Sequence, residues 1–126
     1  MNLKNEFQPI RDWAKQKGIY NKGDVKTQAL KLIEEVGELS KAILNEDEEE
    51  LIDAIGDCVV VLTSLAELGT VYFNPINCKN YPAEPCVIPC EECNDTCSIE
   101  YCINSAYKVI SKRKGQMKNG TFIKDK

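Results

Sequence analysis

One segment of this sequence, Leu32-Ile33-Glu34-Glu35-Val36-Gly37-Glu38-Leu39, combines an apolar stripe with three carboxylates. At about 100° per residue, Glu35 lies beside the stripe of a helix and Glu38 one step further round, whereas Glu34 points away. Two like charges at i and i+3 beside a buried seam favour a cation between them. The stripe recurs at i, i+4, i+7 and i+11, the period of one helix face, and consists of Leu32, Val36, Leu39 and Ile43.

The next predicted helix repeats this combination, because Asp53 and Asp57 enter an apolar run at i and i+4. Residues 55–68 are apolar nearly all round, which is typical of a buried helix. The chain has no His, so a buried Asp57 needs another partner. Inward-facing carboxylates from two adjacent helices suit a hard divalent cation, usually Mg²⁺ where a phosphate completes the ligand shell. The alternative is that these acids form a solvated face.

The spacing of these acids also carries a family resemblance. Glu34-Glu35-x-x-Glu38, a short connection, then Gly56-Asp57 and an apolar run resemble the MazG-like all-α nucleoside triphosphate pyrophosphohydrolases, whose pattern is Glu-Glu-x-x-Glu, a spacer, and Glu-x-x-Asp. The family's second-helix Glu is Ala54 here, so we expect Asp53 to replace it, with Glu50 contributing through water. Further likeness to small phage and bacterial members lies in residues 26–31, 104–108 and 113–117, and the resemblance covers about residues 5–69 and 98–124.

The resemblance implies a fold and a reaction. The fold is all-α and of the four-helix-bundle type, assembled as a homodimer or homotetramer. The reaction is Mg²⁺-dependent (or Mn²⁺-dependent) cleavage of a (d)NTP to (d)NMP and pyrophosphate, including house-cleaning of non-canonical nucleotides. The implied metal ligands are Glu35, Glu38, Asp53 and Asp57, the catalytic acids Glu34, Glu35 and Glu38, and the substrate-binding residues Asn104, Tyr107, Lys108, Lys112, Arg113 and Trp13.

Some of these residues also have an ordinary structural interpretation. Trp13, the only Trp, suits core packing as well as base stacking. The basic residues of the last helix suit a solvated helix end that complements the helix dipole. Two other classes of function stay open, namely a non-catalytic helical interaction module and a zinc-binding adaptor.

Periodicity and capping signals predict four helices. We expect them at residues 3–17, 25–45, 48–68 and 98–114, with a loop at 18–24 and a tight acidic link at 45–49. Asp47 and Ser98 are the expected N-caps of the last two helices. Residues 119–123 predict a turn and a short extended tail. The apolar surface of the third helix exceeds what one short chain can cover, which favours self-association.

Composition fits one small domain spanning residues 1–126. Hydrophobic residues make up 43% of the chain and charged residues 29%, which is ordinary for a globular protein. The net charge of −4 disfavours nucleic acid as a partner. Residues 46–50 are all acidic, whereas residues 108–118 hold five Lys or Arg and no acid. No leader-like N-terminus or long apolar run is evident, so we expect a cytoplasmic protein without a membrane span.

A cysteine-rich insert is expected at residues 70–97, between the third and fourth helices. Four thiols within residues 86–97 suit structural Zn²⁺ in a reducing compartment, with an iron–sulfur cluster as the weaker metal option. Disulfides and free thiols are the alternatives. Cys58 and Cys102 lie on apolar helix faces and are expected to be small core residues. The insert's cysteines are Cys78, Cys86, Cys90, Cys93 and Cys97.

Overall fold

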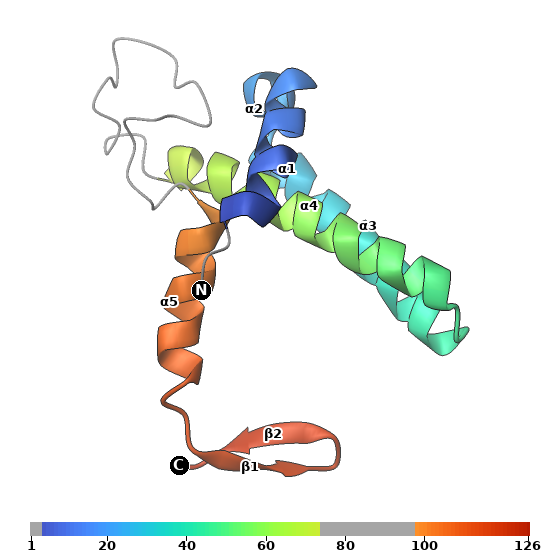
Figure 1. Cartoon of the computed structure of the whole chain (residues 1–126), viewed down its shortest axis with the longest axis vertical. Coiled ribbons are helices and arrows are strands. Elements are labelled where there is room, and N and C mark those ends of the chain that lie inside the picture. Colours follow the sequence, from blue (N-terminus) through green and yellow to red (C-terminus); the bar gives the residue numbers. More distant parts are fainter. Residues whose placement is uncertain (1–3, 74–97) are drawn as a thin grey trace.

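A computed structural model describes residues 4–73 and 98–126. This part of the chain is mostly helical, as predicted, and ends in a two-stranded antiparallel sheet (Figure 1). The helices are α1 (Lys4–Gln16), α2 (Ile19–Lys22), α3 (Val25–Leu44), α4 (Glu48–Phe73) and α5 (Ile99–Ile110), and the strands are β1 (Gly115–Lys118) and β2 (Thr121–Lys124).

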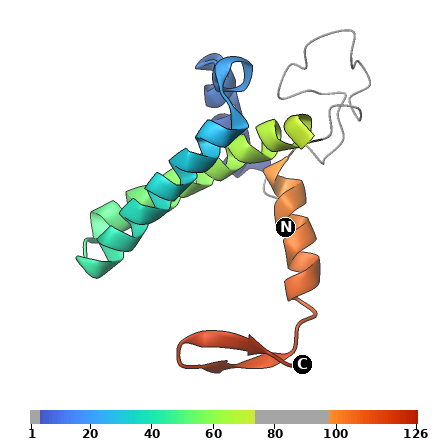
Figure 2. The ribbon, with the colours of Figure 1, turned by 180° about the vertical axis from the view of Figure 1, so that it is seen from behind.

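The α3 and α4 helices form a long antiparallel hairpin (Figures 1 and 2). Asp24 caps the start of α3, where its carboxylate accepts a hydrogen bond from the backbone N–H of Thr27 at 3.2 Å. Asp47 caps α4 in the same way, accepting from the backbone N–H of Glu50 at 3.1 Å. The Asp47 cap was expected from the sequence, and the two caps fix where the two long helices begin.

The turn between α3 and α4 closes with a Schellman motif. The Glu46 N–H donates to the carbonyl of Ile43 at 3.2 Å, and the Asp47 N–H donates to the carbonyl of Ala42 at 3.0 Å. Glu46 has a φ of 54°, in the left-handed region that glycine usually occupies at this position. The chain therefore reverses within a few residues, which sets α3 against α4.

A small core forms where α1 and α2 pack on α4 (Figure 2). Its buried members are Ala14 of α1, Tyr20 of α2 and Leu68 of α4, with Ile19 and Val25 packed against them. This core holds α1 across the second half of α4. The carboxylates of the first half of α4 therefore lie on a separate part of the hairpin.

The α5 helix and the β-hairpin extend away from α4 (Figure 1). Ser98 caps α5, as predicted, because its hydroxyl accepts from the Tyr101 N–H at 3.1 Å. Asn119 and Gly120 have φ values of 51° and 79°, which is the geometry of a type I′ turn. This turn pairs Met117 with Phe122 across the two strands. Neither α5 nor either strand contains a buried residue.

Several predicted boundaries are wrong. The 18–24 loop contains the short helix α2. The third predicted helix continues through Gly69 to Phe73, because one glycine weakens a helix without ending it and the first proline comes at position 75. The last helix ends at Ile110 rather than 114, and the residues after it supply β1, a strand that the sequence interpretation missed.

The predicted burial is partly wrong as well. In α3 the buried residues are Glu35 and Ala42, whereas the expected seam residues Leu32 and Leu39 are half-buried and Val36 and Ile43 are exposed. The reason is that nothing in the described part of this chain covers that face of the hairpin. The described residues of one chain consequently do not close a four-helix bundle by themselves.

The burial of several individual residues also differs from the prediction. Asp57, expected to be buried, is exposed, and so is Trp13, which excludes it from the core of this chain. Cys58 is buried, as predicted, but Cys102 is exposed because the face of α5 that carries it is uncovered. The five cysteines at positions 78–97 lie outside the described residues, so their zinc, cluster, disulfide or thiol state stays a prediction.

Within residues 4–73 and 98–126, no helix combines the length and the apolar character that a membrane crossing requires.

Candidate metal centre

Three carboxylates converge between α3 and α4. Glu35 and Glu38 project from α3 and Asp57 from α4, and each offers an oxygen within 4.8 Å of the oxygens of the other two. The spacing of i and i+3 places the two glutamates on adjacent turns, and the antiparallel hairpin brings Asp57 beside them. Three like charges this close repel one another unless a cation lies among them.

Glu35 is the buried member of the cluster, with 5% of its surface exposed. Its Oε1 accepts from Lys31 Nζ at 2.8 Å, whereas its Oε2 is buried and has no hydrogen-bond partner in the described part of the chain. A buried carboxylate oxygen without a partner is energetically unfavourable. This oxygen therefore fits a metal ligand, and an all-carboxylate donor set suits Mg²⁺ or Mn²⁺.

Lys31 is a residue that the sequence interpretation missed. It lies one turn before Glu35, at the i, i+4 spacing that favours an ion pair, and this spacing was its signal in the sequence. The hydrogen bond to Glu35 raises the pKa of Lys31. Lys31 also contacts Glu34 at 3.4 Å, which leaves exposed Glu34 beside the cluster but outside it.

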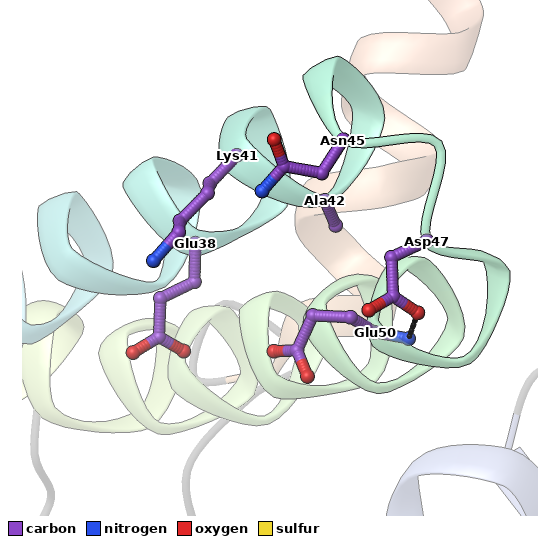
Figure 3. A pocket seen from close by; sticks show the side chains of 6 residues that line it. All are labelled: Glu38, Lys41, Ala42, Asn45, Asp47 and Glu50. Atoms are coloured by element: carbon purple, nitrogen blue, oxygen red, sulfur yellow. Dashed lines mark hydrogen bonds between the residues drawn. The ribbon is translucent and has the colours of Figure 1, made fainter.

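A hollow of about 370 Å³ adjoins the cluster at Glu38 (Figure 3). It lies at the turn end of the α3–α4 hairpin, with the Glu38 and Glu50 carboxylates reaching over α4 in Figure 3. Of its charged lining residues, Lys41 is the cation and the others are acids, so the hollow attracts cations more than free anions. Its lining is Glu38, Lys41, Ala42, Asn45, Asp47 and Glu50.

The remaining predicted ligands lie near the cluster without joining it. Asp53 is exposed, one turn before Asp57, and is outside the group of converging oxygens. Glu50 lines the hollow instead. Ala54 occupies the position of the family's second-helix Glu and is almost fully buried, with 1% exposed. A longer side chain at position 54 would need space that the α3–α4 packing fills.

The predicted substrate-binding residues are not brought to the cluster within one chain. Five of the six belong to α5 and the residues after it, which extend from the Phe73 end of α4, whereas the cluster lies toward the Glu48 end (Figure 1). Trp13 lies on α1, beside the same distant core. The α5 set is Asn104, Tyr107, Lys108, Lys112 and Arg113, and all five are exposed.

Comparison with known families identifies the segment that carries the cluster. Residues 24–75 match the family model of the MazG nucleotide pyrophosphohydrolase domain. This segment is MazG-like. The match confirms the resemblance predicted from the sequence, and Glu35, Glu38 and Asp57 all lie within the matched residues. The matched family is one of nucleotide pyrophosphohydrolases.

One relative extends the comparison to a phage. An uncharacterized 18.2 kDa protein from the rep-hol intergenic region of Haemophilus phage HP1 is 32% identical over 66 residues. The aligned residues cover 52% of this chain and 40% of the phage protein, so the chain spans less than half of that relative. No solved structure matches the chain significantly.

Proposed function

We propose that this chain is a divalent-metal-dependent nucleoside triphosphate pyrophosphohydrolase. Water attacks a phosphorus of the α–β anhydride, the bridging P–O bond breaks, and the products are a nucleoside monophosphate and pyrophosphate. The observation that carries the proposal is the convergence of Glu35, Glu38 and Asp57 inside the MazG-like segment. The substrate class comes from the family match, and non-canonical (d)NTPs are the proposed targets.

The proposed cofactor is Mg²⁺ or Mn²⁺, held by Glu35, Glu38 and Asp57, with Asp53 or Glu50 as further donors. When bound, the cation would neutralise phosphate charge and lower the pKa of water. Support comes from the unpartnered Oε2 of Glu35 and from the hard, all-oxygen donor set.

The residues of the chain have distinct proposed roles. Glu38 belongs to both the cluster and the hollow, which supports its proposed role of orienting the attacking water. Glu34, which contacts Lys31 at 3.4 Å, is the alternative proposed base. The excess of acid in the hollow repels a bare triphosphate, which makes nucleotide binding dependent on cations.

Binding of the nucleotide requires groups that the cluster does not supply. Lys108, Lys112 and Arg113 are the proposed ligands of the pyrophosphate, and Asn104 and Tyr107 supply neutral donors. Trp13, 46% exposed, is free to stack on a base. Since α5 extends away from the cluster, we propose that the working form is a homodimer or homotetramer.

The exposed apolar face of the α3–α4 hairpin supports self-association. Large apolar side chains with more than 40% exposure lie along both helices, which is unusual for a monomer. They are Leu30, Ile33, Val36, Ile43, Leu44, Ile52, Ile55 and Leu62.

Mutation of the cluster tests the proposal. Glu38→Gln and Asp57→Asn should each lower metal-dependent pyrophosphate release from dNTPs by at least about 100-fold, because each removes a ligand charge while keeping the shape. Glu6→Gln, an exposed acid on α1 and outside the cluster, is the matched control and should keep full activity. A near-normal rate in Asp57→Asn would contradict the metal assignment, and absence of turnover in the wild type would favour a non-catalytic module.

A further inference from the structure

We call residues 99–124, which comprise α5 and the β-hairpin, the arm. Neither α5 nor the β-hairpin has a buried residue. A single two-stranded hairpin is marginally stable in water unless it packs on something else. Large apolar side chains are nonetheless exposed throughout the arm, at Tyr101, Tyr107, Val109, Ile110, Met117, Phe122 and Ile123. The arm therefore has the character of a segment that packs on a partner.

The arm is also strongly basic. Residues 108–118 hold five Lys or Arg and no acid. Within the described part of the chain, none of these five side chains belongs to an ion pair. A partner surface that suits the arm would therefore be apolar and acidic.

The turn end of the α3–α4 hairpin is such a surface. Residues 46–50 are all acidic, and none of them belongs to an ion pair in the described ranges. Leu44 and Ile52 lie on either side of these acids and are 82% and 62% exposed. We call this surface, residues 43–52, the acidic tip.

The arm does not reach the acidic tip of its own chain. In both views the arm leaves from the opposite end of α4 (Figures 1 and 2). Its direction is fixed at the base, where Arg11 of α1 bonds Glu100 of α5. An arm that pairs with an acidic tip must therefore use the tip of another molecule.

We infer that the arm of one chain docks on the acidic tip of a second copy. Pairing of two arms with each other is disfavoured because it would bring two basic segments together. Arm-to-tip pairing instead covers apolar side chains on both surfaces and brings opposite charges together.

The docking has a consequence that rests on the proposed function. The acidic tip includes Asp47 and Glu50, which line the hollow beside the carboxylate cluster. A docked arm would place Lys108, Lys112 and Arg113 near the hollow of the second copy, where the pyrophosphate group would need them. The docking itself does not depend on this consequence, since it is measured by association rather than by activity.

Substitutions that remove most of the charge of each surface test the inference on the full-length chain. One variant carries Lys114→Glu and Lys118→Glu in the arm, and the other carries Glu48→Lys and Glu49→Lys in the tip. In sedimentation experiments at micromolar concentration, each variant alone should lose at least about ten-fold in association constant. A 1:1 mixture should recover association, because the unchanged tip of the arm variant can bind the unchanged arm of the tip variant.

The mixture separates docking from misfolding, since a variant that fails to fold cannot be rescued by a second one. Lys15→Glu with Lys22→Glu, on α1 and α2, is the matched control and should associate like the wild type. In a mixture of ¹⁴N-labelled and ¹⁵N-labelled chains, carbodiimide should cross-link arm lysines of one chain to tip acids of a chain that carries the other label.

Three results would overturn the inference. They are a wild type that sediments as a monomer, an arm variant with unchanged association, and a mixture that stays dissociated. Binding of single-stranded DNA is measured for the same variants. If the arm variant loses DNA binding but keeps its association, the arm is a nucleic-acid binding segment instead. Association without pyrophosphate release would leave the docking standing and reject only the proposed activity.

Discussion

Arg11 and Glu100 form a two-point hydrogen-bonded ion pair between α1 and α5, across 89 positions of the sequence. Nη1 donates to Oε1 at 2.6 Å and Nη2 to Oε2 at 2.7 Å. Glu67 of α4 lies 3.9 Å from the same guanidinium and is 2% exposed. Arg11 itself is 5% exposed, and its hydrogen bonds to Glu100 raise its pKa. One arginine thus joins three helices at the base of the arm.

Removal of Arg11 should destabilise the fold. Arg11→Ala removes two hydrogen bonds from half-buried Glu100 and takes the nearby cation away from Glu67, and breaking a buried pair in this way costs about 3–5 kcal/mol. Urea unfolding followed by circular dichroism measures the loss. Lys15→Ala, an exposed position on the same helix, should change the free energy of unfolding by less than about 0.5 kcal/mol. Equal effects of the two substitutions would reject this role for Arg11.

Glu67 should make stability fall as the pH rises. Burial raises its pKa to about 7, so the folded state holds a proton that the unfolded state has released. Its contribution is complete below pH 4.5 and is lost as the pH rises toward 7. Between pH 5 and pH 8, Glu67→Gln should therefore gain about 2–3 kcal/mol relative to the wild type. Unfolding at the two pH values measures this gain, and a constant difference would contradict it.

The Schellman turn should improve when glycine replaces Glu46. The φ of 54° is strained for a residue with a side chain, so Glu46→Gly should stabilise the chain by about 0.5–1 kcal/mol. Glu46→Ala removes the same charge and keeps the strain, which makes it the control. Thermal unfolding at matched concentrations should place the glycine variant above the alanine variant. The reverse order would mean that the side chain of Glu46 matters more than its backbone.

The cluster itself should be destabilising without metal. Glu38→Gln relieves the repulsion among three close carboxylates, so the metal-free variant should gain about 0.2–0.5 kcal/mol over the wild type. Mn²⁺ at 100 times its dissociation constant should stabilise the wild type by about 2.7 kcal/mol and the variant much less. Thermal unfolding with a chelator or with Mn²⁺ measures both effects. A variant that keeps the full metal shift would show that the ion binds elsewhere.

Much of the helical structure could be predicted because its causes are local. The caps at Asp24, Asp47 and Ser98 accept hydrogen bonds three residues ahead, and the sequence shows both partners. The i, i+3 spacing of Glu35 and Glu38 likewise fixed two members of the cluster before any tertiary packing was known.

The rest depends on long-range packing that no local pattern contains. The pairing of Arg11 with Glu100 joins distant segments, and each residue alone looks like an ordinary exposed charge. The buried residues of α3 could not be predicted, because periodicity shows which face of a helix is apolar but not what covers that face. Strand β1 was missed because its polar, glycine-containing residues carry no alternating pattern, although Asn119-Gly120 signalled the turn.

The most direct test of the central claim is the identity of the reaction products. A panel of canonical and modified NTPs and dNTPs should be incubated with the full chain and Mg²⁺ or Mn²⁺, with monophosphate and pyrophosphate measured together. We predict that the two products appear in equal amounts from at least one nucleotide and that a chelator stops both. Release of orthophosphate with a nucleoside diphosphate, or no product from any nucleotide, would contradict it.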